Sequence, residues 1–158
     1  MKRFVFGLVL AVVAIAAVIA LFLTFIDPFQ VSEVSTRKGT QTAAIFLDIT
    51  NRGLIRDCVV GVEVTGEGKM GGEKLKAELH RTVLEQNIMK MVKVEKICVE
   101  PLSTVRMKGA EAEGYHIMVF GDVEKFDTYH VHLVMESGRV IHFDVEAAKN
   151  GHSNDHKH

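Results

Sequence analysis

His80 and Met91 carry donor atoms for a soft metal ion, and the segment between them resembles a β-hairpin. Residues 80–91 read HRTVLEQNIMKM, with apolar and polar residues alternating on both sides of a polar centre. If the hairpin folds symmetrically about Glu85-Gln86, His80 faces Met91 across the strand pair. Side chains directly opposed in an antiparallel pair have Cβ atoms about 4.5–5.5 Å apart. The pattern therefore predicts one histidine–methionine pair from register alone.

A second pair follows at His116 and Met118, which are two residues apart and would point to the same side of a strand. Imidazole is a borderline donor and thioether a soft one. Two imidazoles and two thioethers carry no charge to offset a divalent ion, so the set suits Cu(I) better than Zn(II) or a hard cation. A thioether also forms no disulfide outside the cell, where free thiols tend to oxidise.

With these motifs the chain resembles the periplasmic copper chaperone PCu(A)C family. The likeness extends over about residues 42–145 and rests on both His/Met pairs and their flanking text, TAAIFLDITNRG, ELHRTV, IMKM and GYHIM. The spacer before the second pair is longer than is usual in the family. Residues 109–114 read GAEAEG where the family has Pro-Gly-Gly.

The resemblance implies a cupredoxin-like β-sandwich that binds Cu(I) near its surface. It also implies delivery to a copper-accepting membrane protein, typically the CuA centre of a cytochrome oxidase subunit. The ligands that it implies are His80, Met91, His116 and Met118. Met89, two residues before Met91, is expected to pack rather than bind. No enzymatic activity is expected, because the chain contains neither Gly-x-Ser-x-Gly nor His-Glu-x-x-His.

The N-terminal segment is strongly apolar. Residues 4–26 are twenty-three consecutive residues without a charge, headed by Lys2 and Arg3. As a helix they would measure about 34 Å, against a bilayer core of about 30 Å. A cleaved signal peptide is the alternative, but Ala20 is followed by a poor cleavage site. We expect a transmembrane anchor over residues 4–26, with residues 1–3 cytoplasmic and the remainder extracytoplasmic, in the periplasm or outside.

The rest of the chain predicts an all-β domain, because short runs of period-two alternation recur with turn residues between them. Seven to nine such strands and no further helical pattern indicate an antiparallel β-sandwich, cupredoxin-like or Ig-like. The glycine-rich stretch at 66–72 is typical of a flexible connector. We assign residues 27–41 to a linker or first edge strand, 42–147 to the copper-binding sandwich and 148–158 to a disordered tail.

Charge excludes one class of partner. Without Lys2 and Arg3, seventeen basic residues stand against twenty acidic ones. No basic patch stands out, so nucleic acid is not an expected partner.

Cys58 and Cys98 are the only cysteines. Neither lies in a Cys-x-x-His-x-x-Met loop, which argues against a blue-copper site. In an exported domain a disulfide between them is the natural expectation, with two buried thiols as the alternative. The bond would close a loop of about forty residues, worth about 4 kcal/mol in the chain-entropy model.

Six further histidines are candidates for auxiliary metal binding. His130, His132 and His142 are expected on the outward side of the last hairpin, where an ordinary solvated surface is favoured over a Cu(II) or Zn(II) site. Residues 150–158 of the tail contain no apolar residue and should be disordered. We expect the tail to capture Cu(II) through His152, His156 and His158.

Three functions follow for comparison. The first is a membrane-anchored extracytoplasmic metallochaperone that carries Cu(I). The second is a metal-free exported β-sandwich that assembles or stabilises a membrane complex, in which the methionines and histidines only pack. The third, a copper redox enzyme, needs an open coordination position and redox cycling, whereas a neutral His/Met set favours Cu(I) alone.

Overall fold

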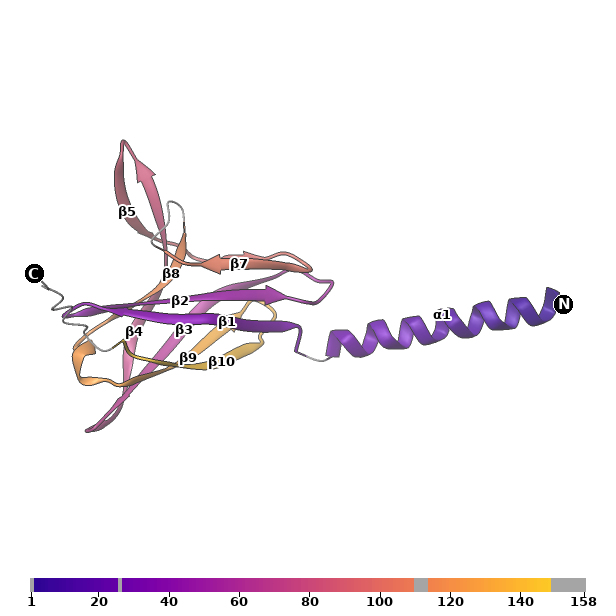
Figure 1. The fold of residues 1–158 in the computed structure, drawn as a ribbon, viewed down its shortest axis with the longest axis horizontal. Helices are drawn as coiled ribbons and strands as arrows, with labels where there is room; N and C mark the ends of the chain where they lie inside the picture. Colours follow the sequence, from indigo (N-terminus) through magenta and orange to yellow (C-terminus); the bar gives the residue numbers. More distant parts are fainter. Residues whose placement is uncertain (1, 26, 110–113, 149–158) are drawn as a thin grey trace, which may run out of the picture.

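The computed structural model describes residues 2–25, 27–109 and 114–148. Within them a helix precedes ten strands and one 3₁₀ turn (Figure 1). The elements are α1 (Lys2–Phe25), β1 (Phe29–Lys38), β2 (Thr42–Asn51), β3 (Asp57–Gly68), β4 (Gly71–Glu85), β5 (Ile88–Lys93), β6 (Ile97–Val99), β7 (Ser103–Met107), β8 (Tyr115–Phe120), η1 (Val123–Lys125), β9 (Thr128–Met135) and β10 (Val140–Glu146).

The strands form one antiparallel sheet in the order β1-β2-β8-β4-β3-β9-β10. Three short strands lie off this path, with β5 on β4, β6 on β3 and β7 on β2. The long strand β4 links the parts of the sheet, because residues 71–75 pair with β3, 76–81 with β8 and 80–85 with β5. The far part of β4 and all of β5 project from the body as an arm (Figure 1).

The two ends of the sheet meet at Thr36 on β1. Its hydroxyl donates to the carbonyl of Glu146, 3.0 Å away, and accepts from the amide of Ala148 at 2.7 Å. The predicted all-β antiparallel architecture is therefore confirmed. Its form is a barrel-like sheet curled around one core, rather than two separate sheets.

The core follows the predicted alternation. Ile45, Leu47 and Ile49 of β2 are fully buried, while the residues between them face the other side of the sheet. The same period places Val131, Leu133 and Met135 of β9 inside. Apolar residues at every second position thus decide which side chains of each strand remain outside.

Of the linker or first edge strand expected at residues 27–41, the structure shows the edge strand, because most of the segment is β1 at one end of the sheet order. The apolar residues Phe29, Val31 and Val34 are not evenly spaced, which hides the period-two pattern. The structure explains the break by a β-bulge between Ser32 and Ser35, with Glu33 at a φ of +52°. An extra residue in one strand shifts the alternation there.

The flexible connector expected at residues 66–72 is wrong, because the stretch forms the paired ends of β3 and β4. β3 continues to Gly68 and pairs with β4 from Gly71, which leaves a two-residue turn. A Cβ on Gly66 would lie 2.6 Å from the ring of Phe126, and one on Gly68 would lie 2.2 Å from the Lys125 carbonyl oxygen. These glycines allow the segment around η1 to pack closely on the hairpin.

α1 extends away from the barrel (Figure 1). Over the residues that the structure describes, no helix has both the length and the hydropathy needed to cross a membrane. The transmembrane anchor expected over residues 4–26 is therefore not confirmed.

Candidate metal centre

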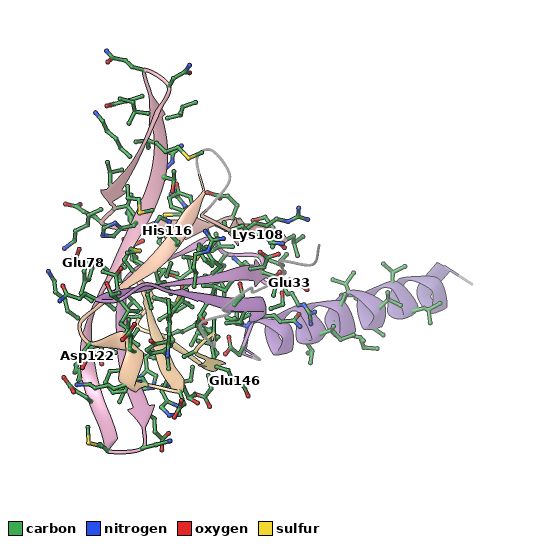
Figure 2. All side chains as sticks on the ribbon, turned by 60° about the vertical axis from the view of Figure 1, so that its left-hand side comes forward. Glu33, Glu78, Lys108, His116, Asp122 and Glu146 are labelled. Atoms are coloured by element: carbon green, nitrogen blue, oxygen red, sulfur yellow. A yellow bond between two sulfur atoms is a disulfide. The ribbon has the colours of Figure 1, made fainter. Side chains whose placement is uncertain are left out.

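His80 and His116 lie directly opposite each other on the neighbouring strands β4 and β8. Their ring centroids are 5.9 Å apart and the ring planes are tilted by 51°. Leu79 and Ile117 point into the core. His80 follows Leu79 and His116 precedes Ile117, so both histidines point to the outer face of the sheet. Two histidines far apart in the sequence thus become cross-strand neighbours; His116 is labelled in Figure 2.

The ring of His116 is buried, with only 1% of the residue exposed. Phe46 lies beside it, with ring centroids 6.2 Å apart. Neither ring nitrogen of His116 has a hydrogen-bond partner of normal geometry among the described residues. Burial lowers the pKa of His116 below its ordinary value; the nearby backbone of Gly114 opposes this shift and His80 adds to it. The ring is therefore neutral near pH 7, as a metal-binding imidazole must be.

His80 has one engaged and one unengaged nitrogen. Nε2 lies 3.2 Å from Oε2 of Glu78, whereas Nδ1 is buried without a hydrogen-bond partner in the described part of the chain. Glu78 also contacts Lys76 and Lys93. His80, then Lys93 and Lys76, hold the pKa of Glu78 at about 2, so its carboxylate is charged.

Met118 lies on the same face of β8 as His116, two residues along the strand. It is half-buried, and its neighbours in the sheet are Glu78 on β4 and Ala44 on β2. The structure thus gathers both predicted histidines and one predicted methionine on one outer face.

The predicted register of Met91 is wrong by two residues. Lys93 faces His80, and Met91 faces Thr82 instead. The turn is formed by Gln86 and Asn87, which both have positive φ, +50° and +63°. Two such residues are typical of a tight type I′ hairpin turn, so the turn centre lies one residue later than the symmetric fold assumed.

A shift of two residues keeps the same face of the strand, so Met91 remains a diagonal neighbour of His80. Diagonal neighbours in a sheet lie about 7–8 Å apart, and their Cβ atoms are somewhat closer. Met91 is 62% exposed on the projecting arm. Met89, for which packing is expected, faces Leu84 farther along the arm and is also exposed. Met91, the fourth predicted donor, is thus near the other three but is exposed to solvent.

The type of donor limits the type of metal. Within residues 2–25, 27–109 and 114–148, no three His, Cys, Asp or Glu side chains come together as a metal site. The donors that the structure places together at this face are imidazole nitrogens and a thioether sulfur, a combination that suits Cu(I).

Sequence reasoning missed three residues that shape the centre. Thr82 is buried; its hydroxyl donates to the Gly109 carbonyl at 2.8 Å, and its amide donates to the Gly114 carbonyl at 3.0 Å. These bonds fasten the segments on both sides of residues 110–113 to β4. Glu78 could have been found from the sequence, since it lies two residues before His80 and shares its face. The close approach of Gly109 left no sequence signal.

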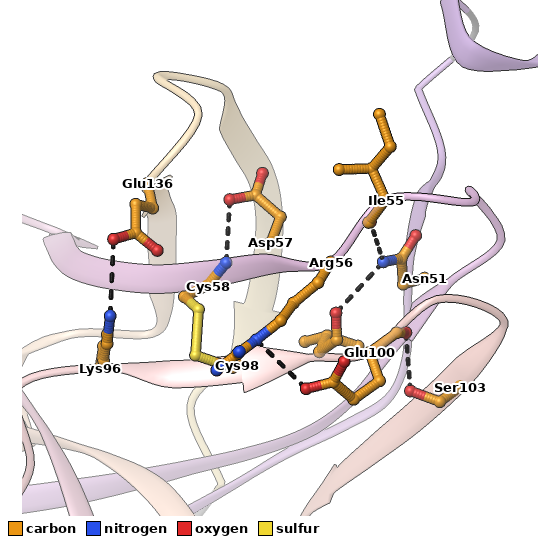
Figure 3. Close-up of polar contacts among 11 residues, drawn as sticks. Asn51, Ile55, Arg56, Asp57, Cys58, Lys96, Cys98, Glu100, Ser103 and Glu136 are labelled. Atoms are coloured by element: carbon orange, nitrogen blue, oxygen red, sulfur yellow. Dashed lines mark hydrogen bonds and ion pairs between the residues drawn. A yellow bond between two sulfur atoms is a disulfide. The ribbon is translucent and has the colours of Figure 1, made fainter.

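Cys58 and Cys98 form a disulfide between paired positions of β3 and β6 (Figure 3). The amide of Cys58 donates to Asp57 Oδ1 at 2.8 Å, and Lys96 and Glu136 form an ion pair nearby. Neither strand carries a predicted copper donor, so the bond stabilises the barrel apart from the metal centre.

The histidines of the last hairpin lie on an outward face, as expected. His132 faces His142, with ring centroids 4.3 Å apart. His130 lies between Asp144 and Glu67, each 2.7 Å from one ring nitrogen. The tail histidines His152, His156 and His158 lie outside the described residues.

Solved structures with this fold include three PCuAC domains. The apo PCuAC domain from PmoF1 aligns with a TM-score of 0.55 at 15% identity, over 77% of this chain and 93% of that one. The copper-bound PCuAC domain from PmoF2 gives 0.53 at 18% identity, over 77% and 94%. The apo PmoF2 domain gives 0.51 at 17% identity, over 75% and 88%. The resemblance noted in the sequence is thus confirmed for the fold.

Comparison of sequences gives a family. The family model described as "Putative lipoprotein LpqE-like" matches residues 25–147. No curated protein matches the chain significantly. The family description indicates an exported, membrane-associated protein.

Proposed function

The chain belongs to the LpqE-like family and has a domain of PCuAC fold, and from this premise we propose that it is an extracytoplasmic chaperone for Cu(I). It would bind one Cu(I) at the face of β4 and β8 and pass it to a membrane copper protein.

One observation carries this proposal: three imidazole nitrogens on two facing rings are buried without a partner among the described residues. They are Nδ1 of His80 and both ring nitrogens of His116. A buried polar atom left unsatisfied costs about 1–3 kcal/mol. Native structures avoid this unless a ligand or water supplies the missing contact. A neutral imidazole has one lone-pair nitrogen, so a metal ion between the rings would bind one nitrogen of each histidine.

The remaining donors favour Cu(I). Met118 shares the face of both histidines, and its thioether sulfur binds soft ions in preference to hard ones. Met91 extends from the arm on the same side and would close the set from above. The four donors bring no negative charge, which suits a monovalent ion. The second candidate, a metal-free assembly domain, leaves the unpaired imidazole nitrogens without an explanation.

The donors differ in their exposure to solvent, and this difference supports release of Cu(I) as well as its binding. His116 is buried, whereas Met91 is exposed. An approaching acceptor would meet Met91 first and could replace its sulfur with a ligand of its own. An acceptor site that contains cysteine thiolates would then hold Cu(I) more tightly than thioethers can. The resemblance to PCu(A)C proteins suggests an oxidase CuA site as the acceptor.

The compartment agrees with this role. A disulfide persists in oxidising compartments and is rare in the cytosol. The family description names a lipoprotein. Cys58 and Cys98 are both in the disulfide, so attachment of a lipid to either sulfur would require breaking that bond. We therefore place the barrel on the extracytoplasmic side of the membrane.

An anaerobic Cu(I) titration of the full chain, with a chromophoric chelator as competitor, tests the proposal. We expect one Cu(I) per chain. His116→Ala and Met118→Leu should each weaken binding at least about tenfold. His132→Ala, on the far outward face, is the matched histidine control and should bind as the wild type does. If the wild type binds no Cu(I), or if His116→Ala binds Cu(I) as tightly as the wild type does, the proposal is wrong and the metal-free assembly role remains.

A further inference from the structure

We propose that Glu78 decides which nitrogen of His80 binds copper: it holds the proton on Nε2 and so leaves Nδ1 for the metal. Glu78 is then a positioning residue that acts through His80. This inference rests on the proposed Cu(I) function and specifies how its site is built.

The contacts of His80 indicate which of its ring nitrogens bears the proton. Its Nε2 lies 3.2 Å from Oε2 of Glu78, while its Nδ1 is buried and without a partner among the described residues. A neutral imidazole has one N–H donor and one acceptor nitrogen. Because a carboxylate only accepts, the proton must be on Nε2 in this contact. The lone pair that remains is on Nδ1.

The Glu78 carboxylate is itself held in place by two lysines. Its other oxygen, Oε1, lies 3.1 Å from Nζ of Lys93 and 3.2 Å from Nζ of Lys76. One lysine comes from β5 and the other from β4, so the carboxylate is held from two strands. Oε1 thus contacts the two lysines, and Oε2 contacts His80.

Glu78 lies beside the proposed copper donors. It faces Met118 across the strand pair, so its carboxylate lies next to the proposed copper donors without being one of them. A charged oxygen with two ammonium partners is a poor ligand for a soft ion. A carboxylate behind a metal-bound histidine instead fixes the ring orientation and raises the basicity of the ligand. Loss of such a partner typically weakens metal binding about 10–100-fold.

The experiment compares Glu78→Gln and Glu78→Leu with the wild type. The ¹⁵N shifts of the His80 ring are recorded in the apo chain and after anaerobic addition of Cu(I), and the affinity is measured by chelator competition. In the wild type we expect an Nε2–H tautomer, with the Nδ1 signal displaced by Cu(I). Glu78→Leu should mix the tautomers and weaken binding about 10–100-fold. Glu78→Gln keeps an acceptor oxygen and should stay closer to the wild type.

Glu63→Leu is the matched control. Glu63 also pairs with a lysine, Lys74 at 3.0 Å, but it lies on β3 and faces His132. Its loss changes the net charge equally and should leave both the His80 signals and the affinity unchanged.

The outcomes separate the two proposals. If the wild type binds no Cu(I), the proposed function fails and this inference fails with it. If the wild type binds Cu(I) but the metal displaces the Nε2 signal, only the role of Glu78 is overturned. Equal losses in Glu78→Gln and Glu78→Leu would also overturn it, because charge or direct ligation would then explain the effect.

Discussion

Gly109 lies against the imidazole of His116, where a Cβ would be only 3.1 Å from Nδ1 of that ring. On its other side the same atom would be 2.5 Å from Cε1 of Phe46. The backbone of Gly109 has a φ of +43°, in the left-handed region. The last described residue before the 110–113 segment thus fixes how closely the chain covers the metal centre.

We expect Gly109→Ala to weaken Cu(I) binding about tenfold or more, since the added methyl group must displace the rings of Phe46 or His116. Left-handed strain adds a cost of about 1–2 kcal/mol to folding. Chelator competition and urea unfolding measure the two effects. Gly138→Ala is the control, because Gly138 has a φ of +85° and a methyl group there would meet no other atom within 4 Å. It should lose stability but keep its affinity. Equal copper binding by both variants would contradict the assigned packing.

The two methionines of the arm should differ in their contribution. Met91 faces Thr82 beside the histidines, and Met89 lies two residues farther out. We expect Met91→Leu to weaken Cu(I) binding about tenfold, as for loss of one ligand, and Met89→Leu to leave it unchanged. X-ray absorption at the copper edge should show one fewer thioether sulfur in Met91→Leu alone. The reverse order of effects would assign the arm ligand to Met89.

The ion pairs of His130 should make part of the stability depend on pH. Glu67 and then Asp144 raise the pKa of His130 above its ordinary value of 6.5. The stabilisation is therefore fully present below about pH 6.5 and is lost as the pH rises through the folded-state pKa. We expect the difference in urea midpoint between the wild type and His130→Gln to shrink between about pH 6 and pH 9. Added salt should reduce it as well, because His130 is partly exposed.

His132→Gln provides the comparison for that series, since His132 is on the same strand and face but faces His142. It removes a histidine from the same face but neither carboxylate contact of His130, so its difference from the wild type serves as the baseline of the series. A His130→Gln difference that stays constant across the range would show that the two carboxylates do not stabilise the charged ring.

Removal of the disulfide should affect folding but not copper. We expect the double variant Cys58→Ala/Cys98→Ala to lose about 2–4 kcal/mol of unfolding free energy, since the bond spans a sequence separation of 40. Its Cu(I) affinity should equal that of the wild type at a temperature where both are folded, because β3 and β6 carry none of the donors. Urea unfolding and chelator competition test the two statements. A parallel loss of affinity would connect the bond to the metal centre.

The sequence by itself determined the faces of the strands. Side chains alternate along a strand for covalent reasons, so the buried Ile45, Leu47 and Ile49 and the shared face of His116 and Met118 could be predicted directly. The alternation fails where backbone conformation changes locally. The bulge at Glu33 interrupts the alternation in β1, which left a linker and an edge strand both open, and the positive φ values at Gln86 and Asn87 moved the hairpin register by two residues.

Only the tertiary structure decided which faces meet. His80 is opposite His116 because β8 is inserted between β2 and β4 in the sheet order, and no local pattern specifies that order. The same packing brings Gly109 onto His116 and leaves three ring nitrogens buried without partners among the described residues. Strand order and register depend on the fit of the whole core, to which every strand contributes at once, whereas the alternation of side chains depends on each strand alone.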